Sequence, residues 1–396
     1  MFKLIFSVAA VTALAQLLQL ISQPLLTYLY AKESFGYLSI IVSIITFISL
    51  ICNFQFNNLI LISKDNINRI FNTGLVSSFI LEFFCFLFLI FFSYFIFQDK
   101  RVELLILTIL YVVFYCFNVL FRAVLLRQGK NKLYSVGILI RSIVVVVSQI
   151  LLSYYNKSLG LVLGVVVSEF VLVLFSVVFC RNNIGFYLNL KDSISVFWEN
   201  KKFLITGTIQ ELISTSMFIS PLLLITYKFS YSVGGEFSVV HKLVWGPAFL
   251  LTQVVSPIFL QYVARDDFKE IYFFNIKNSI VFFCITASIA FYSTGFVFEF
   301  ILKSDWYDAV WMSKYIVIWV LSFIMALPYR VLLRAEKKQI FQLPIDLLLL
   351  IVFMSIFIFD YSFYTYIYIL TIFGTLGNFL IMFASGKIIR DRGWND

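Results

Sequence analysis

The feature that most constrains this chain is a series of long apolar runs separated by short polar intervals. About twelve such runs follow one another along the 396 residues. A run of about 20 apolar residues, wound as a helix, spans the ~30 Å hydrocarbon core of a bilayer. The sequence therefore predicts an all-α integral membrane protein with about 12 transmembrane helices. We expect these helices over roughly 4–30, 36–62, 72–97, 103–127, 133–155, 158–180, 203–228, 237–263, 272–300, 309–335, 342–360 and 363–388.

A polar interval, Arg181–Lys202, divides the chain into two halves of six runs each. Each half also carries a Pro-Leu-Leu segment, beginning at Pro24 in the first and at Pro221 in the second. Six crossings per half give both halves the same orientation, as in transporters built from parallel repeats. We expect a six-helix lobe over 1–180, a cytoplasmic linker over 181–202, a second lobe over 203–396, and a central cavity between the lobes.

The linker alternates apolar and polar residues, with Phe186, Ile194, Val196 and Trp198 among charges. This pattern is compatible with an amphipathic helix at the inner membrane interface. A solvated linker is the alternative.

The net charge of +9 is a topology signal rather than a sign of a nucleic-acid partner. Most of the 30 lysine and arginine residues fall in alternate inter-helix segments that include both ends of the chain. Because basic residues collect on the cytoplasmic side, both termini are predicted to be cytoplasmic. The loops on the other side are short and leave no room for a folded outer domain.

A polar stripe marks the first predicted helix. Gln16, Gln19 and Gln23 lie on one helical face, and an amide exposed to hydrocarbon would cost several kcal/mol. The stripe is therefore expected to face other helices or a water-filled cavity. The first helix of the second half carries Gln210 and Glu211 in the same way.

Cationic residues inside predicted membrane helices are costly unless they face a cavity or a partner. Arg141 is predicted to line a cavity or bind substrate, with a buried ion pair as the alternative. Lys242 is a second cavity candidate, although its side chain could also extend to the interface. Arg122, near the end of its predicted helix, is interpreted as an interfacial anchor.

Three acids lie deep in predicted helices: Glu82, Glu169 and Glu211. Each could pair with a buried cation, or one of them could couple transport to protons or sodium. Asp346, just after Pro344, is interpreted as an acid at a helix N-terminus.

Catalytic and metal motifs are missing. The sequence has no P-loop, HExxH or GxSxG motif, and one histidine, His241, excludes His-based metal clusters and Ser-His-Asp triads. His241 is interpreted as an interfacial residue, with a proton-responsive role as the alternative. The five cysteines are interpreted as packing residues, and Gly160 with Gly164 as a site of close helix packing. We expect no metal, no cofactor and no enzymatic activity.

Two stretches resemble the Wzx-type O-antigen flippases, bacterial polysaccharide transporters of the MOP exporter superfamily. The first is Ala13–Ile44; the second leads from Pro221 through Gly235 and Phe237 to Lys242. The resemblance identifies Lys242 as the basic position of the family's eighth helix. Tyr28 stands where many relatives have an arginine, so no other residue role is carried over.

The resemblance implies a MATE-like fold in the bacterial inner membrane and movement of an undecaprenyl-pyrophosphate-linked oligosaccharide to the periplasmic leaflet by alternating access. It implies the lipid-linked glycan and membrane lipids as partners, with a polysaccharide polymerase and a chain-length regulator as further candidates. Arg141 and Lys242 would offset the charge of the pyrophosphate.

Two other functions remain open. The first is a proton- or sodium-coupled exporter of small amphiphilic solutes, which requires an acid essential to coupling. The second is a membrane enzyme, such as a polysaccharide polymerase or a lipid-linked glycosyltransferase. The lack of an outer domain and of a catalytic cluster disfavours the enzyme.

Overall fold

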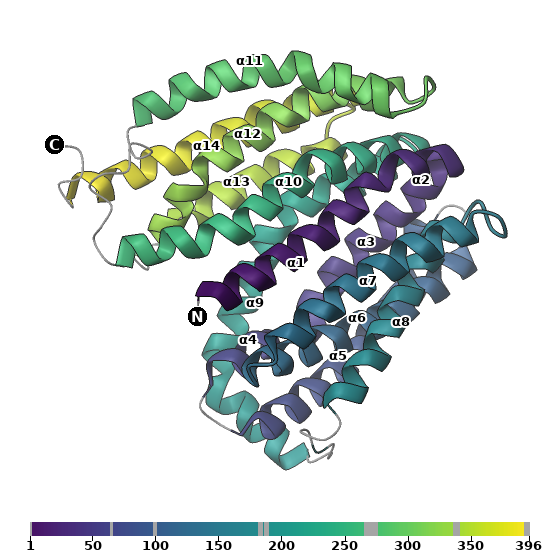
Figure 1. The fold of residues 1–396 in the computed structure, drawn as a ribbon, viewed down its shortest axis with the longest axis vertical. Coiled ribbons are helices and arrows are strands. Elements are labelled where there is room, and N and C mark those ends of the chain that lie inside the picture. The colour runs from purple at the N-terminus through teal and green to yellow at the C-terminus, as the bar shows by residue number, and fades with distance from the viewer. Residues whose placement is uncertain are drawn as a thin grey trace. The chain divides into compact units, whose positions relative to one another are not determined.

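The fold is that of a computed structural model, whose elements are labelled in Figure 1. The structure describes residues 2–63, 66–97, 101–180, 185, 190–264, 276–335 and 341–391, and none of them lies in a β-strand. A helix or a pair of helices covers each of the twelve predicted segments where it is described. The helices are α1 Phe2–Ile21, α2 Gln23–Leu29, α3 Lys32–Asn53, α4 Phe56–Ile62, α5 Ile67–Ile96, α6 Arg101–Arg127, α7 Asn131–Leu152, α8 Gly160–Cys180, α9 Leu190–Lys228, α10 Tyr231–Ala264, α11 Ile276–Ile301, α12 Tyr307–Ala335, α13 Leu343–Met354, the 3-10 helix η4 Ser355–Phe357, and α14 Phe363–Asp391.

Within the described residues, ten helical spans are long and apolar enough to cross a bilayer. Helix α13 with η4 forms a shorter apolar helix over Leu343–Phe357, and α10 is not among the ten. The length and composition of the ten spans make the chain a multi-pass membrane protein.

Contacts between Cα atoms divide the chain into two compact units. Unit 1 comprises Met1–Ser22 and Leu29–Thr215, and unit 2 comprises Gln23–Tyr28 and Ser216–Asp396. In unit 1, α8 packs against α6 and α7, and α1 packs against α7. In unit 2, α12 packs against α10, α11 and α14, and its membrane span is 72% buried.

The first two predicted helices are each interrupted, so their prediction as continuous helices is wrong at these points. The first breaks at Ser22, two residues before Pro24, which has no backbone N–H to continue a helical hydrogen-bond ladder. The second breaks at Phe54 and Gln55, whose φ angles of 42° and 62° lie in the left-handed region. This conformation is unfavourable for residues with a Cβ and needs support from surrounding contacts.

Helix α9 begins at Leu190, so part of the predicted linker is helical. Val196 and Leu204 are fully buried in a hydrophobic cluster with residues of α4, α5 and α6. Arg69 on α5 donates to Ser195 Oγ at 2.7 Å. Residues 190–202 are therefore helical and pack on unit 1 along one side. The predicted linker residues 181–184 and 186–189, including Phe186, lie outside the described residues.

The close helix packing predicted at Gly160 and Gly164 is confirmed. A Cβ on Gly164 would lie 2.6 Å from the side chain of Gln149 and 3.1 Å from its backbone nitrogen. A Cβ on Gly160 would lie 2.3 Å from the hydroxyl of Tyr30, which itself donates to the Gln149 carbonyl at 2.5 Å. The two glycines thus let α8 lie directly against α7 and against Tyr30, in the connection between α2 and α3.

Candidate functional site

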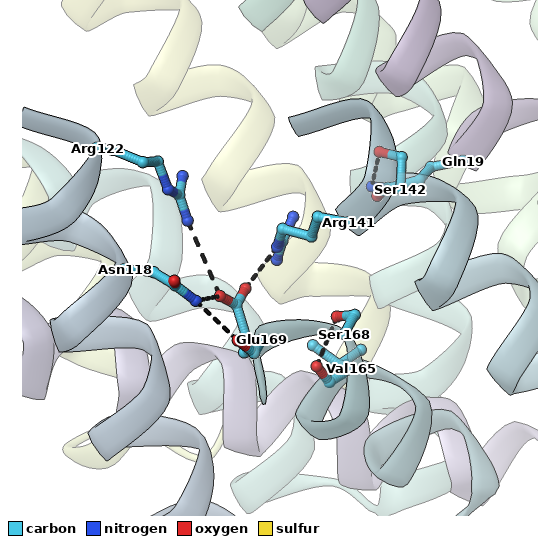
Figure 2. A network of polar contacts seen from close by, with 8 residues as sticks. All are labelled: Gln19, Asn118, Arg122, Arg141, Ser142, Val165, Ser168 and Glu169. Carbon is cyan, nitrogen blue, oxygen red and sulfur yellow. Dashed lines mark hydrogen bonds and ion pairs between the residues drawn. The ribbon is translucent and has the colours of Figure 1, made fainter. Parts of the chain in front are cut away.

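The described residues of unit 1 contain a charged network on three packed helices, shown in Figure 2. Its centre is Glu169 on α8, whose side chain is fully buried. Arg141 on α7 donates from Nε to Glu169 Oε1 at 2.5 Å, and Arg122 Nη2 on α6 lies 3.9 Å from Oε2. Asn118, one turn before Arg122, donates from Nδ2 to Oε2 at 2.7 Å and to the Glu169 carbonyl at 3.0 Å. These contacts hold the carboxylate in place from three sides.

This network carries more positive than negative charge. Two guanidinium groups surround one carboxylate, so the three side chains sum to +1 when all are ionised. Each arginine side chain is 24% exposed, whereas Glu169 is not exposed at all. The Nε and Nη2 atoms of Arg122 are buried and have no hydrogen-bond partner. A buried donor without a partner is costly, so an anion that gained access to these two atoms would find both a positive charge and unused hydrogen-bond donors.

The structure shows an ion pair at Arg141, and the predicted role of this residue in a cavity or in substrate binding stays a prediction. Arg141 forms the ion pair that was its alternative interpretation, and Glu169 is its acid. Arg122 was interpreted as an interfacial anchor, which is wrong because its guanidinium approaches Glu169. The sequence held one signal of this arrangement: Asn118 and Arg122 are four residues apart, which places two polar side chains on the same face of α6.

The glutamine stripe is divided between two helices. Gln16 and Gln19 are on α1, and Gln23 begins α2 after the break at Ser22. Gln19 donates from Nε2 to Ser142 Oγ at 2.7 Å, one residue after Arg141 on α7, so this side chain faces another helix as expected. Gln23 is buried, Gln16 is partly exposed, and Gln210 on α9 is exposed.

Glu211 lies at the helix break of unit 1. Its carboxylate accepts a hydrogen bond from Gln55 Nε2, and the same nitrogen lies 3.4 Å from the carbonyl of Gly207. Asn58 donates to Gln55 Oε1 at 2.5 Å. The left-handed conformation of Gln55 is thus fixed by partners on both α4 and α9. Sequence reasoning identified Glu211 but could not identify its partner.

Glu82 on α5 is 2% exposed, and its side chain interacts with the thiol of Cys116 on α6. Within the described residues, no lysine or arginine forms an ion pair with Glu82. No group of three histidine, cysteine or acidic side chains in that part of the chain could hold a metal ion. Among the three acids, Glu169 is therefore paired with cations, whereas Glu82 and Glu211 have neutral partners.

Lys242 belongs to unit 2 and is partly exposed on α10. Its neighbour His241 was interpreted as an interfacial residue, but it is 9% exposed and lies between aromatic rings. The His241 ring centroid is 6.0 Å from that of Phe237 and 6.1 Å from that of Trp245. Its Nε2 atom is buried without a hydrogen-bond partner.

Sequence reasoning missed a second charged network, in unit 2. Asp346 lies in the first turn of α13, as predicted, and Arg330 Nη1 on α12 lies 3.8 Å from its Oδ1. Gln342 donates to Asp346 Oδ2 at 2.9 Å, and Arg330 Nη2 donates to Asn378 Oδ1 at 2.9 Å. Asn378 on α14 donates in turn to Ser322 at 2.9 Å. One arginine here balances one acid.

The ten apolar spans define the class of this protein as a multi-pass, all-helical membrane protein. The structure is similar to the lipid II flippase MurJ in an inward closed conformation, with a TM-score of 0.77 and 11% identity over 96% of this chain and 87% of that one. It is also similar to an inward-facing multidrug resistance MATE transporter of the MOP superfamily, with a TM-score of 0.69 and 11% identity over 97% and 98%. A MOP superfamily transporter from Pyrococcus furiosus gives a TM-score of 0.62 and 12% identity over 98% and 95%.

The family follows from the sequence. Residues 25–311 match the family described as Polysaccharide biosynthesis protein, and the chain belongs to this family. This match, with the structural neighbours, confirms the resemblance to polysaccharide transporters. A search of curated proteins gives no match.

Proposed function

We propose that the protein is a flippase for an undecaprenyl-pyrophosphate-linked oligosaccharide, which it moves from the cytoplasmic to the periplasmic leaflet by alternating access. The network of Arg122, Arg141 and Glu169 is the observation that carries this proposal. Membership of a polysaccharide biosynthesis family supports a glycan substrate, and the transporter fold supports movement across the membrane.

The chemistry of the substrate fits an arginine-rich site. A pyrophosphate carries at least two negative charges and cannot cross ~30 Å of hydrocarbon unless those charges are compensated. Guanidinium groups bind phosphate oxygens through paired hydrogen bonds, and they remain charged at any physiological pH. Arg122 would supply its unused donors, and Arg141 would supply the part of its guanidinium that Glu169 does not occupy.

The other candidate residues have supporting roles in this proposal. Lys242 is proposed as a further cation that binds the pyrophosphate. Gln16, Gln19, Gln23 and Gln210 would hydrogen-bond to sugar hydroxyls.

Transport would be coupled to a proton or sodium gradient through an acid that lacks a cationic partner. Glu82 and Glu211 meet that condition, whereas Glu169 has two arginines beside it. A carboxylate with only neutral neighbours can exchange a proton or accept a sodium ion without breaking an ion pair. Glu169 is therefore assigned to orienting the arginines.

We place the protein in the bacterial inner membrane with both termini in the cytoplasm. A polysaccharide polymerase and a chain-length regulator would act on the glycan after translocation. The fold similarity to a multidrug transporter makes export of a small amphiphilic solute the second candidate.

The test is the fate of the lipid-linked glycan in a strain that lacks this protein. Single repeat units should accumulate on the cytoplasmic leaflet, where a membrane-impermeant glycosidase added to intact spheroplasts cannot reach them. Re-expression of the wild-type chain should restore surface polysaccharide. Accumulation of unpolymerised units on the periplasmic leaflet would overturn the proposal and point to a polymerase. Normal glycan processing with loss of solute resistance would favour the exporter.

A further inference from the structure

The first half of α9 presents an exposed apolar face. Ile194, Trp198, Ile205 and Ile209 are 59%, 60%, 42% and 52% exposed. Their spacing of four, seven and four residues places them along one side of the helix. The opposite side carries residues buried in unit 1, such as Val196. This half of α9 is therefore amphipathic: one side packs in unit 1, and none of the described residues covers the other side.

Two lysines lie on the same exposed side. Lys201 and Lys202 are exposed and lie on either side of Trp198 and Ile205 in helical projection. The ammonium group of Lys201 lies 4.4 Å from the centre of the Trp198 ring. A tryptophan beside lysines is typical of the boundary between hydrocarbon and headgroups, because the ring is apolar and the cations need polar partners.

The length of α9 places this boundary at the two lysines. The helix has 39 residues and is about 58 Å long, whereas the hydrocarbon core is about 30 Å thick. Lys202 and Lys228 are about 39 Å apart along a helix, close to the ~40–45 Å of a bilayer with its headgroups. Between them, Glu211 is the only charged residue. When the span from Lys202 to Lys228 crosses the membrane, Trp198 and Lys201 lie in a headgroup layer.

We infer that this face of α9, formed by Ile194, Trp198, Lys201, Lys202 and Ile205, binds anionic phospholipid headgroups of the adjacent leaflet. Ile205 would contact the upper acyl chains, Trp198 would lie at the boundary between acyl chains and headgroups, and the lysines would bind the phosphates of lipids that carry a net negative charge. Zwitterionic lipids offer the same phosphate but compensate it with their own cation. The surface would thus select lipids and fix the depth of unit 1 in the membrane, whatever substrate the protein moves.

The experiment uses the full-length protein in vesicles of phosphatidylcholine and phosphatidylglycerol, in which one lipid or the other carries brominated acyl chains. Bromine quenches tryptophan fluorescence on contact, and the difference between the wild type and Trp198→Phe isolates the signal of Trp198. At equal bromine content, brominated phosphatidylglycerol should quench Trp198 about fivefold more strongly than brominated phosphatidylcholine. The double variant Lys201→Gln/Lys202→Gln should remove the preference while quenching persists.

The matched control is Lys132→Gln/Lys157→Gln, which removes the same charge from two other exposed lysines of unit 1 and should keep the preference. Equal quenching by the two lipids in the wild type would overturn the selection of anionic lipid. Lack of quenching by either lipid would show that water or another protein covers this face. A preference that survives Lys201→Gln/Lys202→Gln would overturn the assignment to these lysines. The assay contains no glycan, so its result is independent of the proposed transport activity.

Discussion

The two units each contain a buried acid held by an arginine, but the two networks differ in charge and exposure. In unit 1 the residues lie on α6, α7 and α8, and in unit 2 on α12, α13 and α14, which are the fourth, fifth and sixth predicted membrane segments of each half. Glu169 has two arginines, each 24% exposed, whereas Asp346 has one arginine that is 10% exposed. In unit 2 the charges of Arg330 and Asp346 cancel, and this buried ion pair links α12 to α13. A network with surplus charge and partial exposure can also bind an anion.

The largest expected effect is at Arg141. Its replacement by alanine removes the cation that contacts Glu169 most closely and cancels the surplus charge of the network of Arg122, Arg141 and Glu169. Arg141→Ala should abolish export of surface polysaccharide, and Arg141→Lys should restore part of it, because lysine keeps the charge but not the paired donors. Export is measured by surface labelling, with immunoblots to confirm equal protein in the membrane.

Lys132→Ala, an exposed position at the start of the same helix, is the control and should export normally. Full export in Arg141→Ala would contradict a role for this arginine in substrate binding. Equal loss in the alanine and lysine variants would indicate that the planar guanidinium, rather than its charge, is required.

Substitutions in the charged network of unit 2 should lower the stability of the protein rather than block export. Arg330→Gln or Asp346→Asn alone leaves a buried charge without its partner and should destabilise the protein by about 3 kcal/mol. The double variant removes both charges, so it should recover most of that loss and retain export. Thermal unfolding of the purified variants, compared with export in cells, checks both statements. Loss of export in a double variant of normal stability would mean that the balanced network also takes part in transport.

Three neutral variants distinguish an acid that couples transport to an ion, proposed at Glu82 or Glu211, from an acid that stabilises the structure, proposed at Glu169. Glu82→Gln and Glu211→Gln keep shape and hydrogen bonding without removing the partner of a buried cation, so membrane abundance should stay normal. One of them should lose about tenfold or more of the gradient-driven transport in vesicles, if a single carboxylate carries the ion. Glu169→Gln leaves two arginines beside a neutral side chain and should lower abundance instead. Full gradient-driven transport in both Glu82→Gln and Glu211→Gln would exclude these acids from coupling.

The smallest expected effects are at glycines in the last membrane helix of each half. Gly164→Ala in unit 1 would bring a methyl group against the backbone of Gln149, whereas Gly377→Ala in unit 2 would meet only the side chain of Leu349. Overpacking should cost about 1–3 kcal/mol at Gly164 and less at Gly377, because a leucine side chain can shift. Gly185→Ala serves as the neutral control, because no atom of the described residues lies within 4 Å of the added carbon. Unfolding midpoints that fall in the opposite order would show that α7 and α8 adjust more easily than described.

Hydropathy was sufficient to predict the membrane helices, because twenty-residue apolar runs have one stable arrangement in lipid. It could not predict the break at Gln55, since the contacts that support a left-handed residue come from Glu211, 156 positions away. The buried position of Arg141 and Glu169 was recognisable from charge in an apolar run. Their pairing was not, because it depends on how α7 packs against α8. Arg122 was misinterpreted for the same reason, as distance from a helix end does not indicate which way a long side chain points.

The central claim is that the surplus charge around Glu169 binds the anionic head of the lipid-linked substrate. Its most direct test is the affinity of the purified protein for undecaprenyl pyrophosphate compared with uncharged undecaprenol. Wild-type protein should bind the pyrophosphate lipid at least about tenfold more tightly, and Arg122→Gln/Arg141→Gln should bind the two lipids about equally. A double variant that keeps the full preference for pyrophosphate would contradict the account.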